Sequence, residues 1–217
     1  MREVIAALQE LYGALPVAGM DPLEMILLEN CAYLVDDATR EATLARLREQ
    51  VGLTPEELLA QTPERIAAVI AGGGMKPLMR AQKVLDAARI AVEIGLDELS
   101  AAIANDPKRA KALLRRFPSI GEPYADRVLL FAGTQTGVAP DSNALRVLCR
   151  LGFAREEKNY SAMYRAAVGA VSREVRDNAT ARKAHLLLRR HGQEVCKRTH
   201  PRCEICPLRG RCGWYGA

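Results

Sequence analysis

The sequence contains few aromatic residues and no apolar run long enough to span a membrane. Aromatics make up 5% of the chain, and no stretch alternates apolar and polar residues as a half-buried strand does. The opening residues, MREVIAALQELYG, lack the features of a secretory signal peptide. We therefore expect no membrane association, no major sheet, and a place in the reducing cytoplasm, near the nucleoid if the organism is a bacterium.

Repeats and nucleotide-binding motifs are also absent. The chain has no internal repeat, no low-complexity linker and no Gly-Lys-Ser/Thr phosphate loop, so nucleotide hydrolysis has no support. Alanine, leucine, arginine and glutamate are abundant instead, and all four are good helix formers. With 217 residues the chain can bury a substantial core, as one large domain or two small ones. The composition predicts an all-α protein.

Three helix starts can be read from capping residues. Thr54 is followed by a proline and by a glutamate at position 57, the pattern of a capping box, and Thr62-Pro63 and Asp106-Pro107 repeat the cap and proline. Helices are therefore expected to begin near residues 55, 63 and 107. Apolar periodicity predicts further helices over 2–14, 22–35, 38–51, 78–94, 122–133, 142–151, 160–175 and 180–191.

Positive charge is concentrated in the C-terminal third. From Asp141 onward there are 16 lysines and arginines against 7 acidic residues, a net charge of +9, whereas the preceding part has 15 against 19, a net charge of −4. Such an uneven distribution favours an anionic partner, and nucleic acid is the one we expect. The alternative is that arginine is simply the solubilising residue that this organism prefers.

Four cysteines lie close together near the C-terminus, as C-x6-C-x2-C-x5-C: Cys196, Cys203, Cys206 and Cys212. A tight C-x2-C flanked by two outlying thiols can surround one metal centre. Two disulfides are the alternative, which a reducing compartment disfavours. The spacing alone leaves both a [4Fe-4S] cluster and Zn²⁺ open, because thiolates suit both.

A short turn separates two expected helices near the middle of the chain. Residues 107–117 resemble a basic amphipathic helix, residues 118–121 a hairpin, and a second helix begins at Glu122. The backbone N–H groups at the start of that helix, with its dipole, could hold a phosphate without reading sequence. Taken alone, most turns of this kind only connect helices.

A loop rich in glycine and proline, residues 133–140, ends in Asp141 at the start of another expected helix. By position Asp141 is an N-cap. The same carboxylate would be kept ionised by the helix dipole and the capping N–H groups, which suits it to stabilising a nearby positive charge. The two roles are compatible.

Together these motifs resemble the endonuclease III superfamily of DNA glycosylases. Residues 117–125, FPSIGEPYA, resemble its hairpin pattern, which begins L-P-G-V/I-G. Residues 140–147, PDSNALRV, resemble its catalytic pattern V-D-S/T-H/N-x-x-R-V. The tail from Ala184 to Cys212 resembles its pattern A-H-x-x-L-x-x-H-G followed by the four cysteines.

The resemblance implies an all-α fold of two helical lobes with a DNA-binding cleft between them. One domain, residues 21–134, would be a six-helix barrel that contains the helix-hairpin-helix. Residues 1–20 and 135–217 would form the other, with a [4Fe-4S] cluster in the loop 196–212 held by the four cysteines. The implied partner is double-stranded DNA that contains a lesion, bound by a monomer.

The resemblance also implies roles for individual residues. Asp141 would stabilise the positive charge that develops on the sugar, and Glu29 could protonate the departing base if its helix buries it. A Glu29 on the solvent face, capped by Asn30, is the alternative. The resemblance further implies DNA contacts by Ser119, Ile120, Gly121, Pro123, Tyr124, Lys197 and Arg198. It also implies that Tyr33 and Leu34 fill the gap left by an extruded nucleotide. Core packing is the default for these two residues.

Two departures from the family pattern bear on the reaction. Members that also cut the DNA backbone carry a lysine where this chain has Pro123, so we expect a monofunctional glycosylase that activates water. A bifunctional enzyme that uses another amine, with Lys76 the first to test, and a non-catalytic iron–sulfur DNA-binding protein are the alternatives. Ser119 replaces the first glycine of the hairpin. Uracil, oxidised pyrimidines, alkylated purines and mispaired bases all remain open as substrates.

Overall fold

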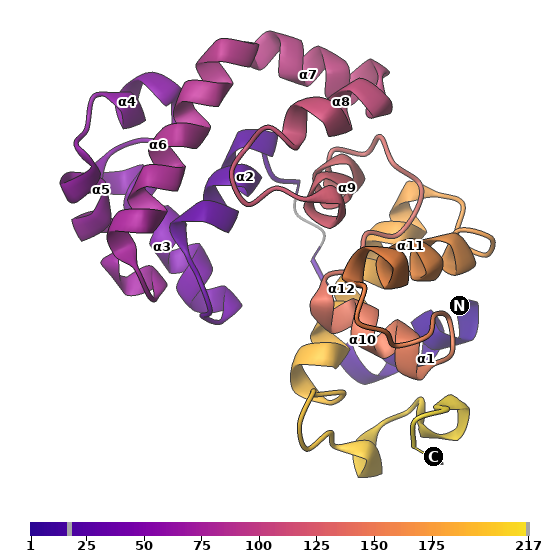
Figure 1. The fold of residues 1–217 in the computed structure, drawn as a ribbon. Coiled ribbons are helices and arrows are strands. Elements are labelled where there is room, and N and C mark those ends of the chain that lie inside the picture. The colour runs from indigo at the N-terminus through magenta and orange to yellow at the C-terminus, as the bar shows by residue number, and fades with distance from the viewer. Residues whose placement is uncertain (17–18, 216–217) are drawn as a thin grey trace. The chain divides into compact units, whose positions relative to one another are not determined.

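The computed structural model describes residues 1–16 and 19–215 of the chain (Figure 1). It divides into two compact units, which we call the terminal unit (Met1–Gly19 and Leu129–Ala217) and the central unit (Met20–Val128). The described residues are helical except for loops and an isolated parallel bridge between Tyr33 and Gly74. The prediction of an all-α fold is therefore confirmed. Within the described ranges no helix is both long and apolar enough to cross a membrane.

The central unit is organised around its longest helix, α6. Its elements in chain order are α2 (Pro22–Cys31), α3 (Asp37–Gln50), α4 (Pro55–Leu59), α5 (Pro63–Val69), the 3-10 turn η1 (Ala71–Gly73), α6 (Pro77–Ile94), α7 (Leu96–Asn105), α8 (Pro107–Leu114) and α9 (Glu122–Phe131), whose last turn crosses the boundary at Leu129. Helix α6 contacts α2, α4, α5 and α7. Its buried face is mostly alanine, which lets neighbouring helices approach closely.

Capping residues start the helices of this unit as the sequence predicts. Thr54 accepts a hydrogen bond from the N–H of Glu57 at 3.3 Å, while the Glu57 carboxylate accepts the N–H of Thr54 at 3.0 Å. Thr62 and Asp106 cap α5 and α8 in the same way. These interactions are local in sequence, so the capping residues alone were enough to predict the three starts.

The terminal unit joins the two ends of the described chain. It contains α1 (Arg2–Tyr12), α10 (Ser142–Arg150), α11 (Tyr160–Val171), α12 (Asn178–Glu194) and the 3-10 turns η2 (Cys203–Ile205) and η3 (Arg209–Arg211). Helix α12 packs on both α10 and α1. Leu8, Leu148, Tyr164 and Leu188 lie in its core, so the first helix belongs to the same core as the last.

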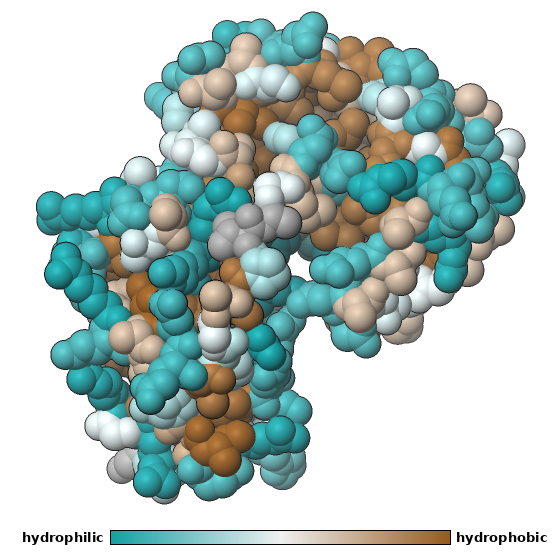
Figure 2. Space-filling model, turned by 180° about the vertical axis from the view of Figure 1, so that it is seen from behind, coloured by the Kyte–Doolittle hydropathy of each residue, from teal (hydrophilic) through white to brown (hydrophobic). Residues whose placement is uncertain are grey.

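Three elements of the structure differ from the prediction, and one of them, the helix expected over 160–175, ends at Val171. The helix expected over 22–35 ends at Cys31, because the next residues pair with Gly73 and Gly74 instead of continuing the helix. Helix α7 was not predicted, although it has apolar residues at helical spacing in Leu99, Ala102 and Ile103. Much of the surface in Figure 2 is hydrophilic, with hydrophobic patches between the polar side chains.

Candidate functional site

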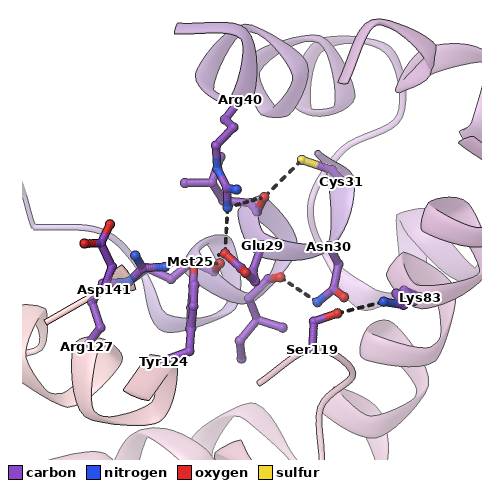
Figure 3. A network of polar contacts seen from close by, with 12 residues as sticks. Met25, Glu29, Asn30, Cys31, Arg40, Lys83, Ser119, Tyr124, Arg127 and Asp141 are labelled. Atoms are coloured by element: carbon purple, nitrogen blue, oxygen red, sulfur yellow. Dashed lines mark hydrogen bonds and ion pairs between the residues drawn. The ribbon is translucent and has the colours of Figure 1, made fainter. Parts of the chain in front are cut away.

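The predicted hairpin joins α8 to α9 in the central unit. Ser119 has a φ of 65°, in the left-handed region that glycine adopts without strain, which accounts for the glycine of the family pattern at this position. Lys83 of α6 donates a hydrogen bond to the Ser119 hydroxyl at 3.0 Å (Figure 3). Phe117 and Ile120 are buried beneath the turn. The N–H groups of Ser119 and Gly121 take no part in the hydrogen bonds of the described residues, so they are available to an anion.

The start of α9 carries the position where bifunctional family members have a lysine. Pro123 stands there, half-buried, and offers no amine. The next residue, Tyr124, is buried, donates its hydroxyl to the carbonyl of Met25 at 2.5 Å and stacks against the Arg127 guanidinium at 3.9 Å from the ring centre (Figure 3). Tyr124 therefore ties α9 to α2, and burial also raises the pKa of its phenol.

Glu29 is a charged residue in an otherwise apolar helix. Its carboxylate accepts from Arg40 at 2.6 Å and lies 3.5 Å from Arg127 (Figure 3). Glu29 is neither buried among apolar side chains nor free in solvent. The two guanidinium groups tie its carboxylate to α3 and α9.

Asn30 does not cap Glu29, so that part of the alternative was wrong. Its side-chain amide is buried and donates to the carbonyls of Ile26 at 2.8 Å and Pro118 at 3.0 Å. The second bond joins α2 to the hairpin, 88 residues away in sequence. Asn30 thus fixes the hairpin against the helix that carries Glu29.

Tyr33 and Leu34 lie on the surface, so the default of core packing was wrong for both. They are 48% and 74% exposed, and Met75, across the bridge, is 61% exposed. Tyr33 donates its N–H to Gly73 at 2.8 Å, which holds the two segments side by side. We call these three exposed side chains the apolar ridge. Nothing in the local sequence distinguishes Met75 from a core methionine, and the sequence-based analysis missed it.

A buried arginine and a glycine hold the apolar ridge together. Arg80 donates to the carbonyls of Ile70 at 2.9 Å, Gly74 at 2.7 Å and Met75 at 2.8 Å, and also to that of Cys31. Gly74 has a φ of 103°, and a Cβ there would lie 2.2 Å from the Tyr33 carbonyl oxygen. Arg80 and Gly74 therefore hold the loop that follows α2 against the loop that precedes α6.

In the terminal unit Asp141 caps α10. Its Oδ1 accepts the N–H groups of Asn143 at 3.0 Å and Ala144 at 2.8 Å, and its Oδ2 pairs with Arg189 of α12. The Asp141 side chain is 14% exposed and that of Arg189 22%. The expected N-cap is therefore confirmed, and the same contacts stabilise the ionised carboxylate.

Arg146 connects the Asp141 segment to the cysteine loop, a role that the sequence-based analysis did not assign. It donates to the Asn143 side chain at 3.0 Å, to the carbonyl of Gly192 at 2.6 Å and to that of Cys196 at 2.8 Å. A Cβ at Gly192 would lie 2.6 Å from the Asn143 carbonyl oxygen, so α10 and α12 can approach this closely only with glycine there.

The four clustered cysteines line one shared cavity that is partly open to solvent. Arg150, Trp214 and Tyr215 are among the other residues that line it. Within residues 19–215 no three Cys, His, Asp or Glu side chains are arranged to hold a single metal ion. Four soft thiols around a cavity, rather than around a point, fit a multi-atom metal cluster better than one ion.

The four thiols lie close enough together that their thiolate forms repel one another. Burial and the neighbouring thiols raise the pKa of Cys206, and burial followed by the charges of Cys212 and Cys196 raises that of Cys203. A bound cationic centre would remove this repulsion. Next to the cavity, Arg150 donates to the Cys196 sulfur at 3.3 Å and to the carbonyl of Lys197 at 2.9 Å, which fixes the backbone of the basic segment 197–202.

The chain is similar in sequence to known endonucleases III. No family model matches the chain. It is 26% identical to endonuclease III of Rickettsia conorii over 162 residues, covering 75% of this chain and 70% of the relative, and 26% identical to endonuclease III of Sulfolobus acidocaldarius over 194 residues, covering 89% and 80%.

Solved structures with a similar fold include endonuclease III and a thymine-DNA glycosylase. A non-covalent endonuclease III–DNA complex has a TM-score of 0.76 at 20% identity and covers 97% of this chain and 92% of the other. A thermostable thymine-DNA glycosylase has a TM-score of 0.75 at 18% identity, covering 99% and 94%. The resemblance indicated by the motifs is confirmed: the chain is similar in sequence to endonucleases III over most of its length, and it shares the fold of these solved structures.

Proposed function

We propose that this protein is a base-excision repair DNA glycosylase that hydrolyses the N-glycosidic bond of a damaged or mispaired base. The observation that carries the proposal is Asp141, a carboxylate held in place at the start of α10, within the segment that resembles the catalytic segment of the superfamily. Cleavage of this bond places positive charge on the sugar ring, and a fixed carboxylate stabilises that charge.

The contacts of Asp141 explain how it would act. Two backbone N–H groups hold Oδ1 in place, so the carboxylate does not need to reorient as charge develops. Arg189 holds Oδ2 and keeps the group ionised before substrate arrives. Asp141 is then the counter-charge for the sugar and the base that orients the attacking water.

Pro123 supports a monofunctional reaction. A lyase needs an amine to form a Schiff base with the sugar, and proline has none in its side chain. Lys76 stays the first alternative amine to test, because it is exposed at the start of α6 and follows Met75 of the apolar ridge directly. Trapping with borohydride distinguishes the two routes, since only a Schiff base gives a covalent protein–DNA adduct.

The structure around Glu29 supports a different role from the one expected. Because Arg40 and Arg127 both contact its carboxylate, Glu29 enters this proposal as the anchor of Arg127, not as the acid that protonates the base. A Glu29→Gln variant would test this. It should weaken the packing of Arg127 on Tyr124, without the change in the alkaline limb of the pH–rate profile that loss of a general acid would give.

We propose that DNA is held in both of the expected domains by residues expected from the sequence, together with Met75 of the apolar ridge. The hairpin residues 119–121 would bind phosphate, the apolar ridge would support the stack where a nucleotide is extruded, and Lys197 and Arg198 would add charge. Binding should weaken log-linearly with salt, and Lys197→Ala should lower the slope by roughly one unit. A slope near zero for the wild type would contradict the electrostatic part of this proposal.

Cys196, Cys203, Cys206 and Cys212 would hold a [4Fe-4S] cluster, supported by the soft donor set and the shared cavity. When bound, such a cluster cross-links the loop and can exchange electrons. Protein purified anaerobically should be yellow-brown and contain about four irons per chain. A colourless protein with one zinc would contradict the cluster, although not the glycosylase proposal.

The decisive experiment is an excision assay on duplexes that carry uracil, oxidised pyrimidines, alkylated purines or mismatches. Release of one base class by the wild type, and its loss in Asp141→Asn, would support the proposal and identify the substrate. A non-catalytic iron–sulfur DNA-binding protein is the second candidate, which the missing lysine at position 123 favours. It predicts tight binding to duplex DNA with no excision of any base in the panel.

A further inference from the structure

Three side chains form a hydrogen-bonded series that ends at one of the cluster cysteines. The Tyr12 hydroxyl of α1 lies 3.1 Å from Nδ1 of His191 on α12, and the Nε2 atom of the same ring lies 3.4 Å from the Cys206 sulfur. All three residues belong to the terminal unit. Tyr12 and His191 are 179 residues apart in sequence, so no local pattern indicates the contact.

The direction of each hydrogen bond follows from the chemistry of the groups. His191 is 1% exposed, and its two ring nitrogens face one partner each, Tyr12 and Cys206. A neutral imidazole has one donor and one acceptor to offer them. A cysteine that ligates a metal is a thiolate, which can only accept. Nε2 of His191 must then carry the proton and donate to Cys206, which leaves Nδ1 to accept the proton of Tyr12.

The surroundings of Tyr12 keep it in the donor state. The Tyr12 ring meets the His191 ring edge-on, with the two centroids 6.1 Å apart. The Arg190 guanidinium lies 4.9 Å from the centre of the Tyr12 ring. Burial raises the pKa of its phenol to about 12, so the hydroxyl retains its proton at neutral pH. The tyrosine thereby selects one of the two tautomers of the histidine.

We propose that His191 is a positioning residue that donates a hydrogen bond to the Cys206 ligand of the metal cluster, and that Tyr12 fixes the tautomer that can donate. This inference rests on the proposed [4Fe-4S] centre. Hydrogen bonds to cluster sulfurs stabilise the more negative, reduced state, and outer partners of this kind tune a metal centre. The reduction potential of the cluster would then depend on a residue of the first helix.

The test is the reduction potential of the iron-loaded protein, followed by voltammetry and by electron paramagnetic resonance. His191→Leu removes the donor and should shift the equilibrium about tenfold toward the oxidised cluster, a fall of about 59 mV for one electron. Tyr12→Phe keeps the ring but leaves the tautomer unselected, and should shift the same equilibrium about threefold in the same direction. His191→Gln can place an amide N–H near the Nε2 position and should restore most of the wild-type potential.

The controls separate this role from simple packing. Tyr160→Phe, a matched change at the start of α11 outside the cysteine cavity, should leave the potential unchanged. A wild type without iron would overturn the proposed cluster and this inference with it. Loaded Tyr12→Phe and His191→Leu proteins with wild-type potentials would overturn only the hydrogen-bonded series. If His191→Leu does not retain the cluster, the conservative Tyr12→Phe variant still decides the question.

Discussion

Replacing Asp141 with asparagine separates its structural role from its proposed chemical role. Asparagine is as good an N-cap as aspartate, so the bonds that Oδ1 accepts from Asn143 and Ala144 can be retained. What is lost is the negative charge, and with it the ion pair to Arg189 and the proposed counter-charge for the sugar. The substitution replaces one carboxylate oxygen with an amide nitrogen of nearly the same size.

The two losses have different expected magnitudes. An exposed ion pair contributes up to about 1 kcal/mol, and breaking a buried one costs about 3–5 kcal/mol. The side chains of Asp141 and Arg189 are 14% and 22% exposed, so we expect about 1–2 kcal/mol and a fall in Tm of about 2–8 °C. Loss of a preorganised charge at the reacting centre should reduce excision by about a hundredfold or more, roughly 3 kcal/mol in activation free energy.

Single-turnover excision and thermal unfolding should be measured on the same preparations. At 25 °C a loss of 1–2 kcal/mol leaves a typical domain almost entirely folded, so instability cannot account for a hundredfold loss of rate. Asp177→Asn is the matched control, because Asp177 caps α12 through the N–H of Thr180. Undiminished excision by Asp141→Asn would mean that Asp141 is only a helix cap and that the chemistry lies elsewhere.

Three further predictions follow from individual positions. The wild type should give no covalent adduct with borohydride, and Pro123→Lys, which places an amine in the first turn of α9, should give one; efficient trapping by the wild type would refute the monofunctional reaction. Gly74→Ala should lower the free energy of unfolding by about 2–4 kcal/mol in denaturant titrations, because its Cβ would meet the Tyr33 carbonyl at 2.2 Å. Gly95→Ala, which also has a positive φ but no contact closer than 3.9 Å, should cost only about 1 kcal/mol, and equal losses would contradict the steric explanation. The N–H of Thr54 lowers the folded-state pKa of Glu57, so its stabilising contribution is present above the unfolded-state value of 4.5 and is lost as the pH falls below it. Thermal melts of Glu57→Gln should therefore depend less on pH in this acid range than those of the wild type.

Sequence was sufficient where the determining contacts are local. The caps of α4, α5 and α8 depend on residues three positions apart, and the structure has all three. The end of α2 depends instead on Gly73, about 40 residues later, so apolar periodicity extended the helix too far. The same limit explains why Tyr33 and Leu34 were expected in the core by default. Their exposure is decided by a neighbouring loop, not by their own segment.

At the candidate site, the arginines show most clearly what could not be predicted from local sequence. Arg80 and Arg146 belong to a chain rich in basic residues, and nothing in the sequence separates an internal connector from a surface charge. In the structure both donate to backbone carbonyls of segments that are distant in sequence. The contact of Arg127 with the Glu29 carboxylate was unpredictable for the same reason, because the two residues lie 98 positions apart.

The division of the terminal unit between the two ends of the chain has a consequence for synthesis on the ribosome. The central unit is continuous and can fold as it emerges, but α1 has no partner until α12 has been made. At about 5–20 residues per second, the roughly 180 intervening residues take about 10–40 s to synthesise. During that interval the apolar face of α1, with Val4, Ile5 and Leu8, is exposed on the nascent chain. The cysteine loop follows α12, so metal loading comes after this delayed pairing, and conditions that slow translation should favour chaperone binding to α1.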